Sequence, residues 1–121
     1  MVNKNVRKAI ESLYKGRCDI YGYGVVTDTN SHLTENKEYI IYENIPCRLS
    51  IKNISAANQL EPFSNIVQDV KLFLSPEYKI KAGCKINVTQ NGITTAYKNS
   101  GQANIKSNHQ EIQLELFEEW A

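Results

Sequence analysis

The sequence predicts a mainly β protein: a small β-barrel of about six strands with one N-terminal α-helix and a long flexible loop. Three observations support this prediction. In residues 80–118, short β-prone runs are separated by turn-forming residues. Asn91-Gly92 lies between two of these runs, and this dipeptide favours a two-residue β-hairpin because both central residues of a type I′ turn need a positive φ. Further β-prone runs earlier in the chain raise the total to about six strands, enough for a small barrel or sandwich.

The first expected element is a short amphipathic helix that Asn3 can cap. Apolar residues recur at helical spacing on one face, namely Val6, Ala9, Ile10, Leu13 and Tyr14. We expect Lys15-Gly16 to end this helix, with the glycine in the left-handed conformation just past the last turn. A helix of about three turns cannot bury its apolar stripe alone, so it must lie on the β-core or on a neighbouring subunit.

Two long strand regions are expected next, at residues 17–28 and 38–51, joined by a polar hairpin loop. In the first, apolar and polar side chains alternate, as expected for a strand with one buried face. Gly22 and Gly24 within it indicate a bulge or a close backbone approach.

Residues 52–65 interrupt the β pattern. This connection of about fourteen residues has no sustained period of 2 or 3.6, and such long loops are usually functional or disordered. Leu60 and Phe63 within it have no obvious core face, which suggests a contact made elsewhere. We therefore expect this loop to be the most mobile part of the isolated protein and to become ordered on assembly.

Strand character resumes at residues 66–74 and recurs up to a final alternating run at 111–116. With 121 residues and no internal linker or repeat, the chain is expected to form a single domain over 1–121. Fourteen basic and thirteen acidic residues give a net charge of +1, which argues against a protein whose main task is to coat nucleic acid.

The three cysteines, Cys18, Cys47 and Cys84, are odd in number and widely spaced. None forms a C-x-x-C pair, so the spacing indicates neither a zinc site nor a redox dithiol. We expect three reduced, buried thiols and no metal. The start of the chain has no apolar signal-peptide core, and no apolar run is long enough for a membrane span, so a cytoplasmic product is expected.

Catalytic chemistry is not expected. The two histidines, His32 and His109, have no carboxylate or thiol partner at the spacing of a triad or a metal site. Glycine-rich nucleotide loops and zinc-protease motifs are also missing from the sequence. We therefore assign no catalytic, cofactor-binding or metal residue.

A nucleic-acid-binding alternative depends on aromatic residues interleaved with basic ones. These residues are Tyr14, Lys15, Arg17, Tyr21 and Tyr23. They could form a base-stacking face like that of an OB-fold. Tyrosine is also simply favoured in strands, and packing explains Tyr39, Tyr42 and Tyr97 equally well, so we prefer a structural role for the tyrosines.

The C-terminal segment is mixed acidic and aromatic, and it carries the only tryptophan, Trp120, one residue from the end. Two explanations remain open. The ring could fold back onto the core, or it could anchor a neighbouring subunit, since aromatic residues dominate interface hot spots. The candidate subunit-interface residues are Tyr14, Phe117 and Trp120.

Taken together, these segments resemble the head–tail connector proteins of siphophages and Gram-positive prophages, also called head-closure or head-completion proteins. The matching segments are the helix at 6–14 and the β-prone runs at 18–26, 46–50, 70–76, 80–88 and 111–117, with Gly92 and Tyr97 between the last two. The resemblance covers nearly the whole chain.

The resemblance implies a small β-barrel that assembles as a ring, a dodecamer in this family, beneath the portal. Such a ring closes the portal channel after DNA packaging and gives the tail a docking surface. The implied partners are the portal or adaptor proteins and a tail-completion protein, with packaged DNA met only as the content of the blocked channel. The protein would be a monomer in isolation, in the host cytoplasm during assembly and at the head–tail junction of the virion afterwards.

In that setting the loop at 52–65 becomes a candidate channel or gating loop. Its candidate residues are Asn53, Ile54, Leu60, Pro62 and Phe63. The loop has no basic cluster, so it would close the channel sterically rather than by neutralising phosphates. The alternative function is an OB-like barrel that binds single-stranded nucleic acid.

Overall fold

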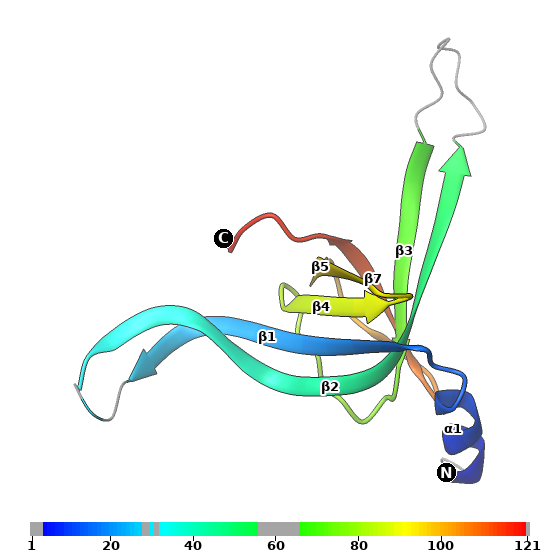
Figure 1. Cartoon of the computed structure of the whole chain (residues 1–121), viewed down its shortest axis with the longest axis horizontal. Coiled ribbons are helices and arrows are strands. Elements are labelled where there is room, and N and C mark those ends of the chain that lie inside the picture. The colour runs from blue at the N-terminus through cyan, green and yellow to red at the C-terminus, as the bar shows by residue number, and fades with distance from the viewer. Residues whose placement is uncertain (1–3, 28–29, 31, 56–65, 121) are drawn as a thin grey trace.

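The computed structural model describes residues 4–27, 30, 32–55 and 66–120 (Figure 1). These residues form one helix and seven strands. In chain order they are α1 (Lys4–Glu11), β1 (Gly16–Thr27), β2 (Thr34–Ser55), β3 (Ile66–Leu74), β4 (Lys85–Gln90), β5 (Ile93–Asn99), β6 (Asn104–Ile105) and β7 (Gln110–Leu116). No helix among them has the length and apolar character needed to cross a bilayer.

Six strands close into a ring in the order β3-β2-β1-β4-β5-β7, with antiparallel pairing throughout. The ring is closed by β3 and β7, whose register runs from Val70↔Leu114 to Leu74↔Gln110. The two-residue β6 pairs with β7 beside this ring. The structure therefore confirms a mainly β fold of about six strands with one N-terminal helix.

The core fills the inside of this ring because alternate residues of each strand point inward. Its buried apolar side chains are Cys18, Ile20, Ile45, Cys47, Val70, Leu72, Leu74, Ile80, Cys84, Ile86, Val88, Tyr97, Ile112 and Leu114. The outward residues between them are exposed or half-buried, as in β4, where buried and less buried residues alternate.

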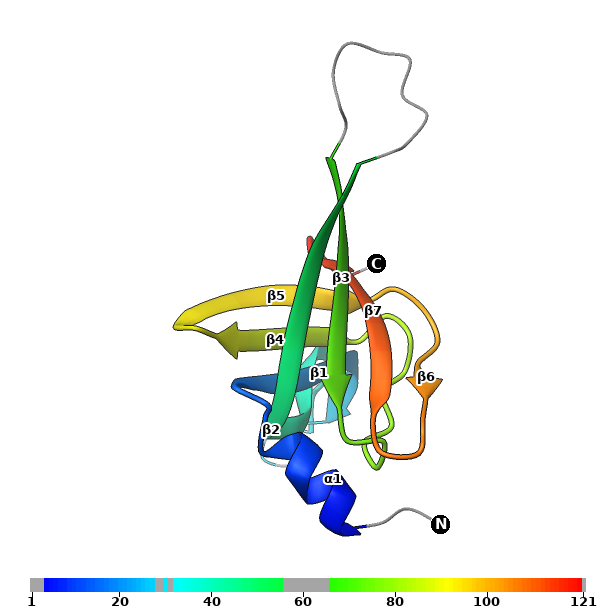
Figure 2. The ribbon, with the colours of Figure 1, turned by 90° about the vertical axis from the view of Figure 1, so that its right-hand side faces the viewer.

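Two β-arms project from the ring in different directions, and β2 takes part in both (Figures 1 and 2). In the β1–β2 arm, residues 22–27 pair with residues 34–39. In the β2–β3 arm, residues 52–55 pair with residues 66–69. The long β2 is bent between the arms by register shifts opposite Cys18, Ile20 and Tyr21, since extra residues in one strand increase its local twist.

Of the two predicted glycines in β1, Gly22 marks a close approach, whereas a Cβ on Gly24 would make only an ordinary 3.6 Å contact with Tyr39, and the bulges lie in the partner strand. An added Cβ on Gly22 would lie 2.8 Å from the Tyr39 ring. In β2, Asn44 has a φ of 54°, and its N–H donates a 2.7 Å hydrogen bond to Asp19 Oδ1. The polar hairpin loop expected to reach residue 37 ends earlier, because β2 begins at Thr34.

The predicted end of the helix at Gly16 is wrong. The helix ends at Glu11, and its last turn tightens into i→i+3 bonds, from Leu13 N to Ile10 O and from Tyr14 N to Glu11 O. Gly16 does not have a positive φ but begins β1. It is a close-packing glycine, because an added Cβ would lie 3.0 Å from Cys47 O.

The predicted start of the long loop at residue 52 is also wrong. Residues 52–55 continue β2 and pair with β3, from Lys52↔Asp69 to Ser55↔Ile66. Residues 56–65 lie outside the described residues, so the mobility expected of them stays a prediction.

The hairpin predicted at Asn91-Gly92 is confirmed. Gln90 pairs with Ile93, and the two residues between them have φ values of 54° and 77°. This is the two-residue connection that the dipeptide favours, because glycine adopts a positive φ without steric cost.

Replacing Gly92 by valine should lower the free energy of unfolding by about 1–3 kcal/mol, because a β-branched residue is strained at a positive φ. Urea unfolding measures the change. Gly101→Val is the matched control, since Gly101 lacks a positive φ and has open space around its Cβ position. Equal stability of the two variants would contradict the turn geometry.

Candidate functional site

In the described parts of the chain, no group of three or more His, Cys, Asp and Glu residues could hold a metal ion. His32 is exposed between β1 and β2, and His109 precedes β7. The two histidines therefore do not lie at one site.

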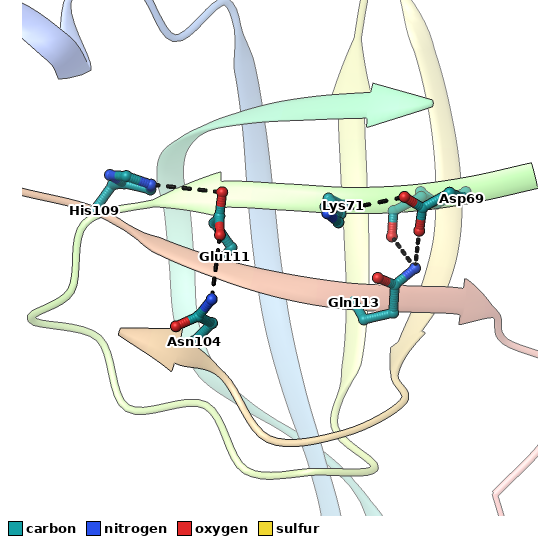
Figure 3. A network of polar contacts seen from close by, with 7 residues as sticks. Asp69, Lys71, Asn104, His109, Glu111 and Gln113 are labelled. Atoms are coloured by element: carbon teal, nitrogen blue, oxygen red, sulfur yellow. Dashed lines mark hydrogen bonds and ion pairs between the residues drawn. The ribbon is translucent and has the colours of Figure 1, made fainter. Parts of the chain in front are cut away.

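Polar contacts lie on the outer face of the sheet, where β3 and β7 close the ring (Figure 3). They form two groups, one of Asn104, His109 and Glu111 and the other of Asp69, Lys71 and Gln113. Glu111 lies 3.7 Å from His109 Nε2 and accepts a 3.4 Å hydrogen bond from Asn104 Nδ2. Gln113 Nε2 donates to Asp69 Oδ1 on β3. These partly exposed contacts link neighbouring strands, and each ion pair is worth about 0–1 kcal/mol.

Two of the predicted interface residues, Phe117 and Trp120, pack against this chain's own sheet. The Trp120 ring stacks on Tyr23 with centroids 5.2 Å apart and meets Phe117 edge-on at 5.1 Å. Its Nε1 donates a 3.3 Å hydrogen bond to Glu38 Oε1. In this structure Trp120 thus folds back, and a contact of either ring with a neighbouring subunit stays a prediction.

Lys85 contacts Glu38 and two aromatic rings. Its Nζ lies 2.9 Å from Glu38 Oε1 and faces the rings of Phe117 at 5.0 Å and Tyr21 at 5.6 Å. Such cation–π contacts add to the ion pair where the ammonium is partly removed from water, and the Lys85 side chain is 19% exposed. We call Tyr21, Tyr23, Glu38, Lys85, Phe117 and Trp120 the tail cluster.

Two of the tyrosines proposed for base stacking are covered by other members of the tail cluster. Tyr21 and Tyr23 lie under Lys85 and Trp120, so neither ring is open for base stacking on that side. A different groove of about 450 Å³ lies beside the cluster. Its walls include Tyr39 and Trp120 together with Lys79 and Lys81, a combination of aromatic and basic groups that the sequence pattern did not indicate.

Tyr14, the third predicted interface residue, lies at the end of the helix rather than in the tail cluster. It is half-buried, and burial, followed by the nearby Glu11 charge, raises its pKa. Its hydroxyl and Glu11 Oε1 have no hydrogen-bond partner within the described structure. Most of the helix stripe is uncovered, with Val6 41% and Leu13 72% exposed.

A basic pocket lies beside this helix end. Its volume is about 310 Å³, and it is lined by Leu13, Lys15, Arg48, Gln90 and Asn91. The Arg48 guanidinium lies 5.5 Å from the centroid of the Phe73 ring. Arg17, near the start of β1, is also exposed. None of the three cations makes an ion pair with any residue that the structure describes. We call the five lining residues, Leu13, Lys15, Arg48, Gln90 and Asn91, the helix-end pocket.

The candidate gating residues fall in two groups. Asn53 is exposed on the β2–β3 arm, and the backbone of Ile54 pairs with Val67 in the same arm. Leu60, Pro62 and Phe63 lie outside the described residues.

The three thiols are buried, as predicted, and none is in a disulfide. A hydrogen bond with Cys47, together with burial, raises the pKa of Cys18 far above its ordinary value, and burial raises the pKa of Cys84. Both effects favour the neutral thiol, which is the unreactive form.

We expect the native protein to react with a thiol reagent at least tenfold more slowly than the urea-unfolded chain, because only the thiolate reacts and these thiols are buried. The raised pKa values also set a pH dependence. In the unfolded chain the thiols of Cys18 and Cys84 ionise near pH 8.5, whereas their pKa values are raised in the folded state, so stability should fall as the pH rises above about 8.5. Rapid labelling of the native state, or stoichiometric zinc by elemental analysis, would contradict buried, metal-free thiols.

Comparisons with known proteins give one distant likeness. No family model matches the chain, and neither does any curated protein. Among solved structures, the chain is similar to the xkdH protein of the phage-like element PBSX from Bacillus subtilis, with a TM-score of 0.49 and 18% identity. The match covers 83% of this chain and 91% of that one.

Proposed function

We propose that this protein is a structural component of a phage head–tail connector, which closes the portal channel after DNA packaging and gives the tail a docking surface. The observation that carries this proposal is a small closed sheet with two β-arms that extend away from its core (Figures 1 and 2). The resemblance of the helix and strand segments to head-closure proteins supports it from the sequence.

The exposed apolar residues favour an assembly protein over a free-standing monomer. On the β1–β2 arm, Val25 and Tyr39 are 68% and 44% exposed, and Ile40, next to the base of the arm, is 47% exposed. Ile51, where the β2–β3 arm leaves the ring, is 50% exposed. Single exposed apolar residues are normal, but several along one projecting ribbon indicate a surface that a partner covers.

The β2–β3 arm is the element that we propose reaches into the channel. Its four paired positions beyond the ring extend about 13 Å, at about 3.3 Å per residue. The arm pairs Lys52 with Asp69, so its described residues present no excess of positive charge. Closure would therefore be steric, with arms from the copies in a ring meeting around the channel axis.

The proposed partners follow from this role. They are further copies of the chain in a ring, a portal or adaptor protein above it and a tail-completion protein below it. The protein would act in the host cytoplasm during assembly and remain at the head–tail junction of the virion, with no catalytic step of its own.

Inactivating the gene in the phage or prophage that encodes the chain tests this function. We expect DNA-packaging heads that lose their DNA or fail to join tails, seen by electron microscopy, and full particles on complementation. Normal yields of tailed, DNA-filled particles without the protein would overturn the proposal.

The groove beside the tail cluster favours a second candidate, binding of single-stranded nucleic acid, because aromatic faces next to lysines suit bases and phosphates. Titration of a labelled oligonucleotide at low and physiological salt separates the two. For the connector we expect at most weak, salt-sensitive binding. Tight binding at physiological salt that is lost in Lys79→Glu/Lys81→Glu would favour the second candidate.

A further inference from the structure

The C-terminal segment has an inner and an outer side. Phe117 and Trp120 are half-buried in the tail cluster, while Leu116, Glu118 and Glu119 are exposed. Leu116 is 66% exposed, and neither glutamate forms an ion pair with a described residue. The aromatic contacts thus hold in place a short surface that offers one apolar side chain and two negative charges. We call Leu116, Glu118 and Glu119 the tail surface.

The helix-end pocket offers the complementary set. Leu13 is an uncovered apolar side chain at its rim, and Lys15 and Arg48 supply positive charges without an ion-pair partner in the described structure. Arg17, also exposed, adds a third charge beside it. An apolar side chain next to unpaired cations on one surface matches an apolar side chain next to unpaired carboxylates on the other.

These two surfaces lie at different places on the closed sheet, because the pocket includes Gln90 and Asn91 at the β4–β5 turn, whereas Leu116 pairs with Tyr97 further along β5. In both Figure 1 and Figure 2, the C-terminus lies away from α1 with the body of the sheet between them. One molecule therefore cannot bring its own tail surface to its own pocket without undoing the tail cluster. Two different patches on one subunit are what a heterologous contact requires, and such contacts form a closed ring when the rotation allows it.

We propose that copies of this chain associate head to tail, with the tail surface of one copy bound in the helix-end pocket of the next. This inference rests on the proposed function and names the contact between its subunits. It gives the predicted interface residues separate roles: Phe117 and Trp120 position the tail surface, and Tyr14 supports the pocket on the other copy. The β2–β3 arms project elsewhere (Figure 2) and stay free to meet at the channel.

Cross-linking of the full-length protein tests this contact directly. In Leu13→Cys/Glu118→Cys, a short bismaleimide should join successive copies into a ladder of multimers on a denaturing gel, because each chain carries both ends of the contact. The native thiols are buried and should not compete. Either single variant should give dimers at most. No ladder at the highest soluble concentration would overturn the proposal.

Charge exchange tests the complementarity in the same cross-linking background. A Lys15→Glu/Arg48→Glu variant and a Glu119→Lys variant should each reduce the ladder by about tenfold or more, since each places like charges together. Mixing the Lys15→Glu/Arg48→Glu variant with the Glu119→Lys variant should restore the ladder. Each pocket then meets a tail surface of opposite charge on the other variant. Lys106→Glu is the control, because Lys106 is an exposed cation that belongs to neither surface, and this change should leave the ladder unaltered.

Other outcomes distinguish this contact from phosphate binding by the pocket and from the proposed connector function. If Lys15→Glu/Arg48→Glu leaves the ladder intact but abolishes oligonucleotide binding, the pocket serves phosphates and the head-to-tail contact is wrong. If cross-linking fails while the gene-inactivation phenotype is that of a connector protein, the proposed function stands and this contact alone falls.

Discussion

Replacing Leu72 by alanine should lower the free energy of unfolding by about 2–5 kcal/mol, the range for a buried leucine whose cavity collapses only in part. Leu72 is fully buried in β3 and pairs with Leu49 on one side and Ile112 on the other. It therefore lies at the seam where the ring closes. The cavity would weaken the packing that keeps β3 and β7 together, so the loss should lie at the upper end of that range.

Urea unfolding followed by circular dichroism measures this loss, and Leu116→Ala is the matched control. Leu116 lies in the neighbouring strand β7 but is 66% exposed, so its truncation should change stability by no more than about 0.5 kcal/mol. A loss below about 1 kcal/mol for Leu72→Ala would mean that the seam is not part of the packed core.

The strands of this fold could be predicted because their patterns are local. Val70, Leu72 and Leu74 alternate along β3, and all three point into the core. The turn at Asn91-Gly92 could be predicted for the same reason, since the dipeptide itself specifies the positive φ values. The pairing of β3 with β7 could not, because strands far apart in the chain leave no sequence mark of the register that joins them.

Two errors show where local patterns mislead. A glycine after a helix is compatible with a left-handed C-cap and with a tight packing position, and only the nearby Cys47 carbonyl shows that Gly16 is the second kind. The sequence predicts too early an end for β2 because residues 52–55 lie in an arm outside the ring. Lys52 and Asn53 are both exposed there, so neither side chain contributes to an alternation of buried and exposed positions, and the strand resembles a loop in sequence.

The candidate surfaces were predicted only in part. A lone tryptophan beside acidic residues marks Trp120 in the sequence as a candidate contact residue, but nothing there indicates its contacts with Tyr23 and Glu38. The Lys85–Glu38 pair joins residues 47 positions apart, and Arg48 reaches the helix end only because β1 and β2 pair there. Such sites come from strand register, which brings together side chains from separate segments.

Replacing Gln110 by leucine should cost about 2–4 kcal/mol of stability, because it leaves two backbone carbonyl groups without their donor, each worth about 1–3 kcal/mol. Gln110 is 1% exposed, and its Nε2 donates to Ser75 O at 2.7 Å and to Tyr78 O at 2.6 Å. It thereby fixes the turn after β3 to the start of β7. Leucine has a similar volume, so the loss would come from the missing hydrogen bonds rather than from a cavity.

The same substitution should also release Tyr78. Its ring packs edge-on against Tyr42 at 5.0 Å, and burial, followed by the charge of Glu77, raises its pKa. In Gln110→Leu the turn should loosen, so that the pKa of Tyr78 falls toward its ordinary value near 10, which alkaline absorbance titration measures. Gln102→Leu, at an exposed position on the β5–β6 connection, should change neither quantity. Unchanged stability and an unchanged Tyr78 titration in Gln110→Leu would show that water replaces the amide and that the turn does not depend on it.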